Sequence, residues 1–557
     1  MKLSEKTAAE VRLSDIFYNY VSRTSARWRG YERVLLVELV RALDESTFAL
    51  TLAMNRDELR SRDFVRHSIV HGAAAGLRPF LQNVQNTPGG VPWGPTTPEL
   101  SLFADTYLKN CGKLSNVQRI ASFERYGLAK SHFVSSNHLV IEVLSAEDER
   151  EDVESALWLL DYDRNKQIDE EIRHAQNAEY VKAKIDQYVE VSNEWFIQYS
   201  PDWESMKYFR RCAELKSAGT AEANAFAVNA SFGDWSYGNW MSCALDAYGR
   251  ILHHVACATS LRARHDDLVL RNLLTVFARK EDIFNVWLES GLEPSFATEV
   301  IKSFTLDFEA AADAECRYDI PVPYYIDFGR DFVLLPMFGG LLNSHASVLS
   351  YLKKNYRADW DRAVGARENI FRSELQDLFS SPRYVVPDTG FQLRRNDGSV
   401  LTDIDAVVLD QERGVLVLVQ LKWHDIYSRS LKERASRKTN LEKANEWVDR
   451  VHSWIGDRSS RTIAKEWNLS GAGDCAPFIL VVARHASRFV DFVDRNEKAC
   501  WISWPRLVRL VSQSSSGSVV DIINDETLMG DESSKSEHLK TKVQYSFPDL
   551  LVDVHLS

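Results

Sequence analysis

Long apolar runs and paired cysteines are both missing from this sequence. No run of about 18 uncharged apolar residues occurs, so the sequence predicts no membrane-spanning helix and no membrane partner. The first residues, MKLSEKTAAEVRLSD, carry charges where a secretory leader has its apolar stretch, so we expect no leader. The seven cysteines stand singly without a CxxC pair, which is typical of reduced thiols rather than a disulfide framework or a zinc site. These absences predict a cytoplasmic protein.

Several catalytic motifs are absent as well. The chain has no GxxxxGK[ST] phosphate loop, so it predicts no ATP-driven motor, and it has no GxSxG nucleophile motif. The pair His253-His254 and the HDD at 265–267 resemble metal ligands of phosphohydrolases, but such sites need histidines and aspartates from several helices. We therefore expect His265 to be a surface or helix-capping residue.

Charge is unevenly spread along the 557 residues. The chain carries a net charge of −12, from 67 Lys/Arg and 79 Asp/Glu, which by itself argues weakly against a nucleic-acid partner. Residues 365–511 nevertheless hold 23 basic and 20 acidic residues, a net +3, which leaves −15 for the remainder. A mildly basic segment within an acidic chain directs attention to the second half.

Three regions are predicted from the apolar pattern. Residues 1–345 show mixed three- and four-residue spacing, which predicts a mostly helical region with a hairpin near 322–336. Its role is unknown, and it is a surface through which a second copy or a partner protein could bind. Residues 346–511 read as helix, three strands, helix, strand. Residues 512–557 are polar and Ser-rich, which predicts a partly disordered tail, although FPDLLVDVHL could dock onto the body.

The stretch LTDIDAVVLDQERGVLVLVQLKW, residues 401–423, concentrates polar residues at strand ends. If its turn is centred on Glu412 and Arg413, Asp405 lies opposite Gln420 and Asp403 lies opposite Lys422. All four side chains then share one face, while Ile404, Ala406, Val408, Val417 and Val419 form an apolar opposite face. Charges at the ends of buried strands cost free energy unless something compensates them, so this cluster predicts a site.

Oxygen donors beside a lysine suit a hard divalent cation. Mg²⁺ takes carboxylate, amide or carbonyl, phosphate and water oxygens, and Mn²⁺ is the alternative ion. We expect Asp405 to be the main metal ligand, Gln420 a second ligand through its oxygen, and Asp403 an outer partner. Lys422 would orient or deprotonate the attacking water.

The motif DID…VQLKW after a glutamate-bearing helix resembles the PD-(D/E)XK nuclease superfamily, in its Q-x-K variant. Mrr-type restriction enzymes are similar in having Gln at this place. The resemblance covers about 150 residues in the C-terminal region, and the predicted order of elements is similar to the superfamily's αβββαβ core. The resemblance implies that a large helical region is followed by a C-terminal restriction-endonuclease-like domain. It also implies that the activity is that of a Mg²⁺-dependent endodeoxyribonuclease. Gln420 in place of the commoner acidic ligand removes one negative charge from the metal site.

The resemblance also implies a glutamate from the preceding helix. Phe371, Leu375, Leu378 and Phe379 mark that helix's buried face, which contains Glu368 and has Glu374 at its edge. We therefore expect Glu368, rather than Glu374, to face Asp405.

A basic cluster follows Lys422. The segment RSLKERASRK places five cations against one glutamate, and several could contact phosphates beside the site: Arg429, Lys432, Arg434, Arg437 and Lys438.

The pattern thus predicts a nuclease that hydrolyses DNA, with defence against foreign DNA as a role that the resemblance implies. Three alternatives remain open. The residues Asp403, Asp405 and Lys422 could form an ordinary ion-pair cluster at a sheet end. The protein could be a non-catalytic interaction protein built on a degenerate nuclease fold. The substrate could also be RNA. For the basic cluster, the alternative is a solvated helix face.

The basic cluster is tested by salt dependence. Replacing Arg434 and Arg437 by Ala should weaken DNA binding and reduce the slope of log affinity against log salt by about one charge for each arginine. An unchanged slope would favour the solvated-face alternative.

Overall fold

Two apolar stretches, 406–409 and 415–421, form the centre of a five-stranded sheet in the C-terminal half. In the computed structural model the strand order is β11-β14-β15-β16-β17. Strand β14 pairs antiparallel with β11 on one side and with β15 on the other, and β16 and β17 continue parallel to β15. The structure describes residues 6–52, 60–85, 87–144, 168–218, 220, 222–380, 382–423, 431–484, 495–513, 518–524 and 541–556.

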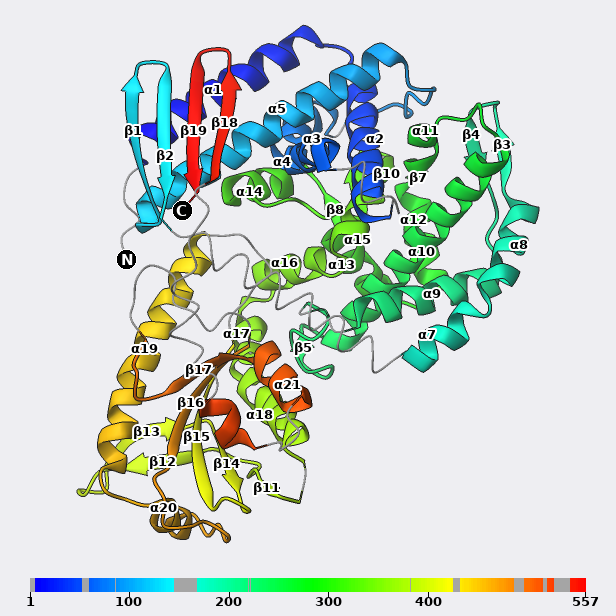
Figure 1. Cartoon of the computed structure of the whole chain (residues 1–557). Coiled ribbons are helices and arrows are strands. Elements are labelled where there is room, and N and C mark those ends of the chain that lie inside the picture. Colours follow the sequence, from blue (N-terminus) through cyan, green and yellow to red (C-terminus); the bar gives the residue numbers. More distant parts are fainter. Residues whose placement is uncertain are drawn as a thin grey trace.

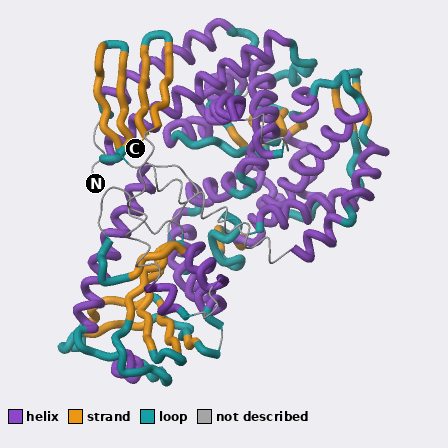
Figure 2. The backbone as a smooth tube through the Cα atoms, in the orientation of Figure 1, coloured by secondary structure: helices purple, strands orange, loops and turns teal. Residues whose placement is uncertain are grey.

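Helices cover both faces of this sheet, and we call the resulting unit the α/β lobe (Figures 1 and 2). Ala406, Val408, Val417 and Val419 pack with α18 and α21 on one face. The alternate residues, including Val407 and Leu418, pack with α19 on the other face. The elements of the lobe are α18 (Arg367–Leu378), β11 (Tyr384–Val385), β12 (Phe391–Arg394), β13 (Val400–Ile404), β14 (Ala406–Asp410), β15 (Val415–Lys422), α19 (Leu431–Ile455), α20 (Ser460–Glu466), β16 (Phe478–Ala483), β17 (Cys500–Ser503) and α21 (Trp504–Gln513).

The N-terminal part of the chain is mostly helical, as predicted, and forms a larger helical lobe (Figure 1). Among the described residues, no helix is long and apolar enough to cross a membrane. The helices are α1 (Ala8–Arg27), α2 (Glu32–Thr51), α3 (Arg60–His71), α4 (Ala73–Val84), α5 (Pro98–Ser122), η1 (Phe123–Tyr126), α7 (Ile168–Ala175), α8 (Ala178–Tyr188), α9 (Trp203–Ser217), α10 (Tyr237–Arg264), α11 (Leu270–Leu274), α12 (Lys280–Glu289), α13 (Pro294–Phe304), α14 (Phe308–Arg317), α15 (Phe338–Leu342), α16 (Ala346–Asn355) and α17 (Arg357–Gly365).

Strands also contribute to this lobe. The predicted hairpin near 322–336 is confirmed as β9 and β10, within a sheet of order β7-β10-β9-β8. Other strands were not expected from the apolar pattern. The strands are β1 (Ala129–Ser135), β2 (His138–Val143), β3 (Glu190–Ser192), β4 (Phe196–Gln198), β5 (Ser231–Phe232), β6 (Trp235–Ser236), β7 (Val276–Arg279), β8 (Thr305–Leu306), β9 (Tyr325–Asp327) and β10 (Phe332–Leu335).

The C-terminal segment returns to the helical lobe. Strands β18 (Thr541–Phe547) and β19 (Leu550–Leu556) form a hairpin, and β19 pairs in parallel with β2 to complete a sheet of order β1-β2-β19-β18. His138 Nε2 lies 3.0 Å from the Asp553 carboxylate across this junction. The part of the expected polar tail that includes FPDLLVDVHL is therefore ordered sheet.

The two lobes meet at the start of α18. Helices α16 and α17 belong to the helical lobe's core through Leu349, Leu352 and Trp360, so the junction falls later than the expected boundary at residue 346. Arg367, only 2% exposed, donates to the Ala225 carbonyl at 3.0 Å. Its guanidinium lies over the Phe226 ring at 4.5 Å. The first residue of α18 is thus anchored in the helical lobe.

Gly390 allows a close approach at the junction of β13 and β14. A Cβ at this position would lie 2.3 Å from the Ile404 carbonyl oxygen and 3.1 Å from that of Asp405. Gly390→Ala should therefore destabilise the protein by about 1–3 kcal/mol, measured by urea unfolding, because backbone must shift to admit the methyl group. Gly365→Ala is the matched control, since a Cβ there meets nothing within 4 Å. Equal stability of the two variants would contradict the close approach.

Candidate functional site

The register of β14 against β15 places Asp405 beside Gln420. Ala406 pairs with Val419 and Asp410 pairs with Val415, which confirms the predicted register about Glu412 and Arg413. The Asp405 side chain accepts hydrogen bonds at Oδ2 from the Leu421 amide, at 2.7 Å, and from the Gln420 side-chain amide. Asp405 and Gln420 are both buried. The two polar residues therefore meet at the sheet end that the sequence indicated.

Asp403 does not join them. The ladder breaks at residue 405, and the preceding strand β13 pairs with β12, where Asp403 lies opposite Gln392 instead of Lys422. The Asp403 residue is exposed, and its carbonyl accepts from Trp447 Nε1 at 2.7 Å. The prediction that Asp403 faces Lys422 is wrong.

The same break also moves Ile404. Its side chain packs on the α19 face of the sheet, whereas Ala406 and Val408 pack on the α18 face. The regular alternation assumed from the sequence ends at the break, so the expected grouping of Ile404 with Ala406 and Val408 is wrong.

The first turn of α18 brings Glu368 to the same place. Its charge raises the pKa of Asp405 and favours the charged form of Lys422, so the three groups interact. Glu374 instead forms a two-nitrogen ion pair with Arg484, whose Nη2 lies 3.1 Å from Glu374 Oε1. Glu368, and not Glu374, thus lies with Asp405.

Burial sets the protonation of the site. Desolvation, and then the nearby Glu368, raise the pKa of Asp405 to about 6, although the Leu421 amide and Lys422 favour its ionised form. Desolvation also lowers the pKa of Lys422, against the attraction of Asp405 and Glu368, and Lys443 on α19 adds to the lowering. Perturbed pKa values of this kind, with a carboxyl that resists ionisation beside an amine that releases its proton more readily, are typical of functional sites.

The donor set suits a hard cation. Within the described part of the chain, no three residues of His, Cys, Asp or Glu gather in a group that could hold a metal. The cluster has two carboxylates, Asp405 and Glu368, with the Gln420 amide as a third oxygen source. The negative charge of Glu368 disfavours the ionised form of Asp405. A bound divalent cation would offset this repulsion between the two carboxylates. A half-turn of the Gln420 amide would present its oxygen. These residues supply oxygen atoms of the kind that Mg²⁺ and Mn²⁺ take as ligands.

The predicted basic cluster is only partly described. Arg429 lies outside the described residues. Lys432, Arg434, Arg437 and Lys438 lie on the first turns of α19, within the described backbone but with side chains outside the description. Helix α19 contacts η1 of the helical lobe.

The histidines that resembled phosphohydrolase ligands are packed as structural groups. His253 Nε2 lies 2.7 Å from the Tyr188 hydroxyl, and His254 Nδ1 lies 2.8 Å from that of Tyr199. Burial lowers the pKa of both imidazoles to about 4. His265 is exposed and caps the C-terminus of α10, which confirms the prediction for it.

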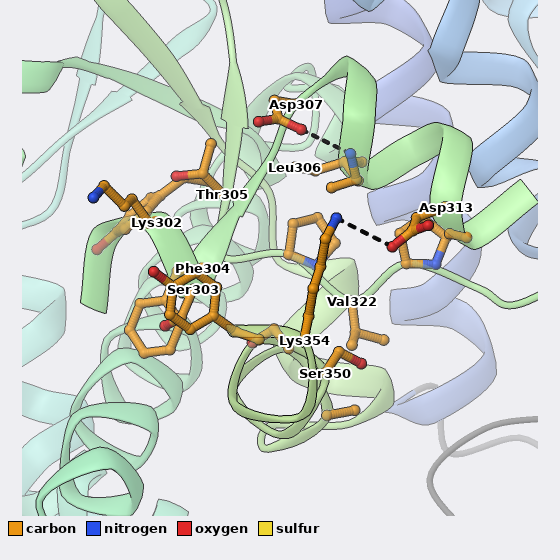
Figure 3. A pocket seen from close by; sticks show the side chains of 18 of the residues that line it. Lys302, Ser303, Phe304, Thr305, Leu306, Asp307, Asp313, Val322, Ser350 and Lys354 are labelled. Carbon is orange, nitrogen blue, oxygen red and sulfur yellow. Dashed lines mark hydrogen bonds and ion pairs between the residues drawn. The ribbon is translucent and has the colours of Figure 1, made fainter. Parts of the chain in front are cut away.

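A large cavity lies elsewhere, in the helical lobe, with a volume of about 1060 Å³ (Figure 3). Its mouth carries cations that already have acidic partners. Lys354 Nζ lies 3.3 Å from Asp313 and Lys280 Nζ lies 2.6 Å from Asp327. Because each of these lysines is neutralised by an aspartate, the pairs favour neither an anionic nor a cationic ligand. The Asp405 cluster is therefore the stronger candidate for a reactive site.

Sequence reasoning missed the arginines that surround the site. The Arg484 guanidinium lies over the Trp423 ring, 4.5 Å from its centroid, and over the Phe371 ring at 5.3 Å. Arg372 Nε donates a hydrogen bond to the Asp405 carbonyl at 2.5 Å. The available signal was the i, i+4 spacing of Glu368 and Arg372 on a helix.

Comparisons with protein-family models, curated proteins and solved structures returned no match.

The raised pKa of Asp405 predicts a pH-dependent stability. In metal-free buffer the unfolded state ionises near 3.8 and the folded state near 6, so the native state loses stability as pH rises through this interval. Asp405→Asn removes that loss. Urea unfolding should find the variant about 3 kcal/mol more stable than wild type near pH 8, with the difference vanishing below about pH 4.

Asp403→Asn is the matched control, because it makes the same substitution at an exposed aspartate of the same segment that lies outside the cluster. An Asp405→Asn variant that is less stable than wild type near pH 8 would support the ion-pair alternative.

Proposed function

We propose that this chain is a metal-dependent nuclease that hydrolyses phosphodiester bonds of DNA, on a restriction-endonuclease-like α/β lobe. The observation that carries the proposal is the convergence of Asp405, Gln420, Lys422 and Glu368 at one sheet end. Apart from the separate β12–β13 hairpin and the short helix α20, the order α18-β11-β14-β15-α19-β16 follows the αβββαβ order of the resemblance, which supports the assignment. Defence against foreign DNA is the role that this resemblance suggests.

Asp405 and Gln420 would hold the metal, with Glu368 as the carboxylate from the helix. Bound Mg²⁺ supplies charge stabilisation to the phosphoryl oxygens and lowers the pKa of a coordinated water. Lys422 faces Asp405 from the next strand end. Desolvation favours its neutral form, and in that form it would accept a proton from the attacking water as the new P–O bond forms. The phosphorus–oxygen ester bond then breaks, and the leaving oxygen takes its proton from solvent.

The basic first turns of α19 support DNA as the substrate. Helix α19 begins at Leu431, shortly after β15 ends at Lys422, so we expect cations of this basic segment to reach phosphates beside the site.

One observation favours the non-catalytic alternative. Arg372 already pairs with Glu368, so this part of the cluster has a counter-charge without metal. A degenerate interaction protein would keep that ion pair and bind no metal.

Cleavage of plasmid, single-stranded DNA and RNA in Mg²⁺ or Mn²⁺ tests the proposal. Asp405→Ala should abolish cleavage, because it removes the main metal ligand. Lys422→Ala should reduce cleavage about 100-fold or more while metal and DNA binding persist, since its role is with the water and the transition state.

Asp403→Ala is the matched control, an aspartate of the same segment that lies outside the cluster, and it should cleave like wild type. Cleavage of RNA alone would reassign the substrate. A wild type that cleaves none of the three and shows no Mg²⁺-dependent rise in melting temperature would leave the interaction protein as the better account.

A further inference from the structure

Arg372 binds two parts of the site at once. Its guanidinium donates from Nε to the main-chain carbonyl of Asp405 at 2.5 Å, from Nη1 to Asn369 Oδ1 at 2.9 Å, and from Nη2 to Glu368 Oε1. The residue is 6% exposed, so these bonds form in a largely desolvated environment. A single side chain therefore joins the helix glutamate to the strand that carries the buried aspartate.

The place where Arg372 meets the strand is the break at Asp405. This residue belongs to neither β13 nor β14, so its carbonyl lies between the two ladders, where Arg372 is its donor. The close approach of Gly390 brings a second segment against the same carbonyl, and a Cβ there would lie 3.4 Å from Arg372 Nη2. The conformation of residue 405 is thus held from the helix side and from the loop side.

Glu368 needs such a partner more than Asp405 does. Its side chain is 48% exposed on the first turn of α18, where an unbound glutamate samples several rotamers. Arg372, one helical turn later, fixes one carboxylate oxygen by a charge-assisted hydrogen bond. The second oxygen, Oε2, takes no part in that bond and can serve a metal.

We propose that Arg372 is a positioning residue of this site, which holds the Glu368 carboxylate and the Asp405 main chain at the separation that lets both carboxylates share one divalent cation. The inference rests on the proposed metal site. Groups that orient metal-binding carboxylates typically contribute about 10- to 100-fold to metal affinity or activity. Arg372 touches no reacting atom, so its contribution lies in metal binding and not in the chemical step.

The fork of the guanidinium is essential to this role. A lysine keeps the positive charge, but its single nitrogen cannot bond Glu368 and the Asp405 carbonyl in the same geometry. If the geometry of the guanidinium matters, lysine cannot replace Arg372. If only the positive charge matters, lysine can replace it.

Mn²⁺ binding to the full chain, measured by calorimetry, tests the proposal apart from cleavage. Arg372→Gln should bind Mn²⁺ about 10- to 100-fold more weakly than wild type, and Arg372→Lys should lie nearer to the Gln variant than to wild type. In cleavage assays both variants should need more Mg²⁺ for half-maximal rate and recover most of the wild-type turnover at saturating Mg²⁺.

Arg383→Gln is the matched control. Half-buried Arg383 forms an ion pair with the buried Asp410 at the opposite end of β14, with Nη2 2.6 Å from Oδ2. Its substitution should lower stability and leave Mn²⁺ affinity unchanged. If Arg372→Gln behaves in the same way, Arg372 is merely structural and the inference fails.

Tighter Mn²⁺ binding by Arg372→Gln would also overturn it, because Arg372 would then be a counter-charge that the metal must displace. If Arg372→Gln does not fold, Arg372→Lys decides by the same affinity measurement. A wild type that binds Mn²⁺ through Asp405 but cleaves no nucleic acid refutes the nuclease and leaves the role of Arg372 to be judged by affinity. A wild type that binds no Mn²⁺ refutes both.

Discussion

The hydrogen bond from the Leu421 amide to the Asp405 carboxylate defines the geometry of the α/β lobe's sheet end. It forms only because β14 and β15 pair in one register, and a slip by one residue would turn the aspartate to the other face. The register is in turn fixed by the apolar residues of both strands, which are buried on two sides by α18 and α19. The polar cluster is therefore held in place by the hydrophobic core around it.

Buried arginines connect that core to its surroundings. Arg367 reaches the helical lobe, Arg383 pairs with Asp410, and Arg484 joins Glu374 to an aromatic cluster. Each buried charge has a large desolvation cost, which only well-formed hydrogen bonds or ion pairs offset. Such groups tolerate few alternative arrangements, so they restrict how α18 can lie on the sheet and where its first turn can be.

The sequence was sufficient where the information is local. Apolar alternation and a polar turn determine the β14–β15 register. Helical periodicity predicts Glu368 within the buried face of α18, but its side chain is 48% exposed on the first turn, where the helix end leaves it uncovered. The break at Asp405 is not local, because it depends on Gly390 and Arg372, which belong to other segments. The sequence pattern alternates regularly across residue 405, so it predicts the wrong positions for Asp403 and Ile404.

The strands of the helical lobe are hard to predict from the sequence for the same reason. Strand β19 pairs with β2, which is distant in the chain, and parallel pairing leaves no hairpin signal in either segment. Its residues were therefore grouped with a polar tail. The short strands of this lobe, such as β5 and β8 with two residues each, also lack the length that makes a strand recognisable in a sequence.

The pairing of β19 with β2 makes the α/β lobe an insertion between two parts of one sheet. Until residues 541–556 have been synthesised, β2 presents a free edge, and unpaired edges are sites of aggregation. Buried residues such as Leu139 and Ile141 pack with Val552 and Val554 from the late hairpin. During translation the helical lobe can therefore complete its outer sheet only after the whole α/β lobe has been synthesised, so the part of the chain that is made first acquires its last strands at the end.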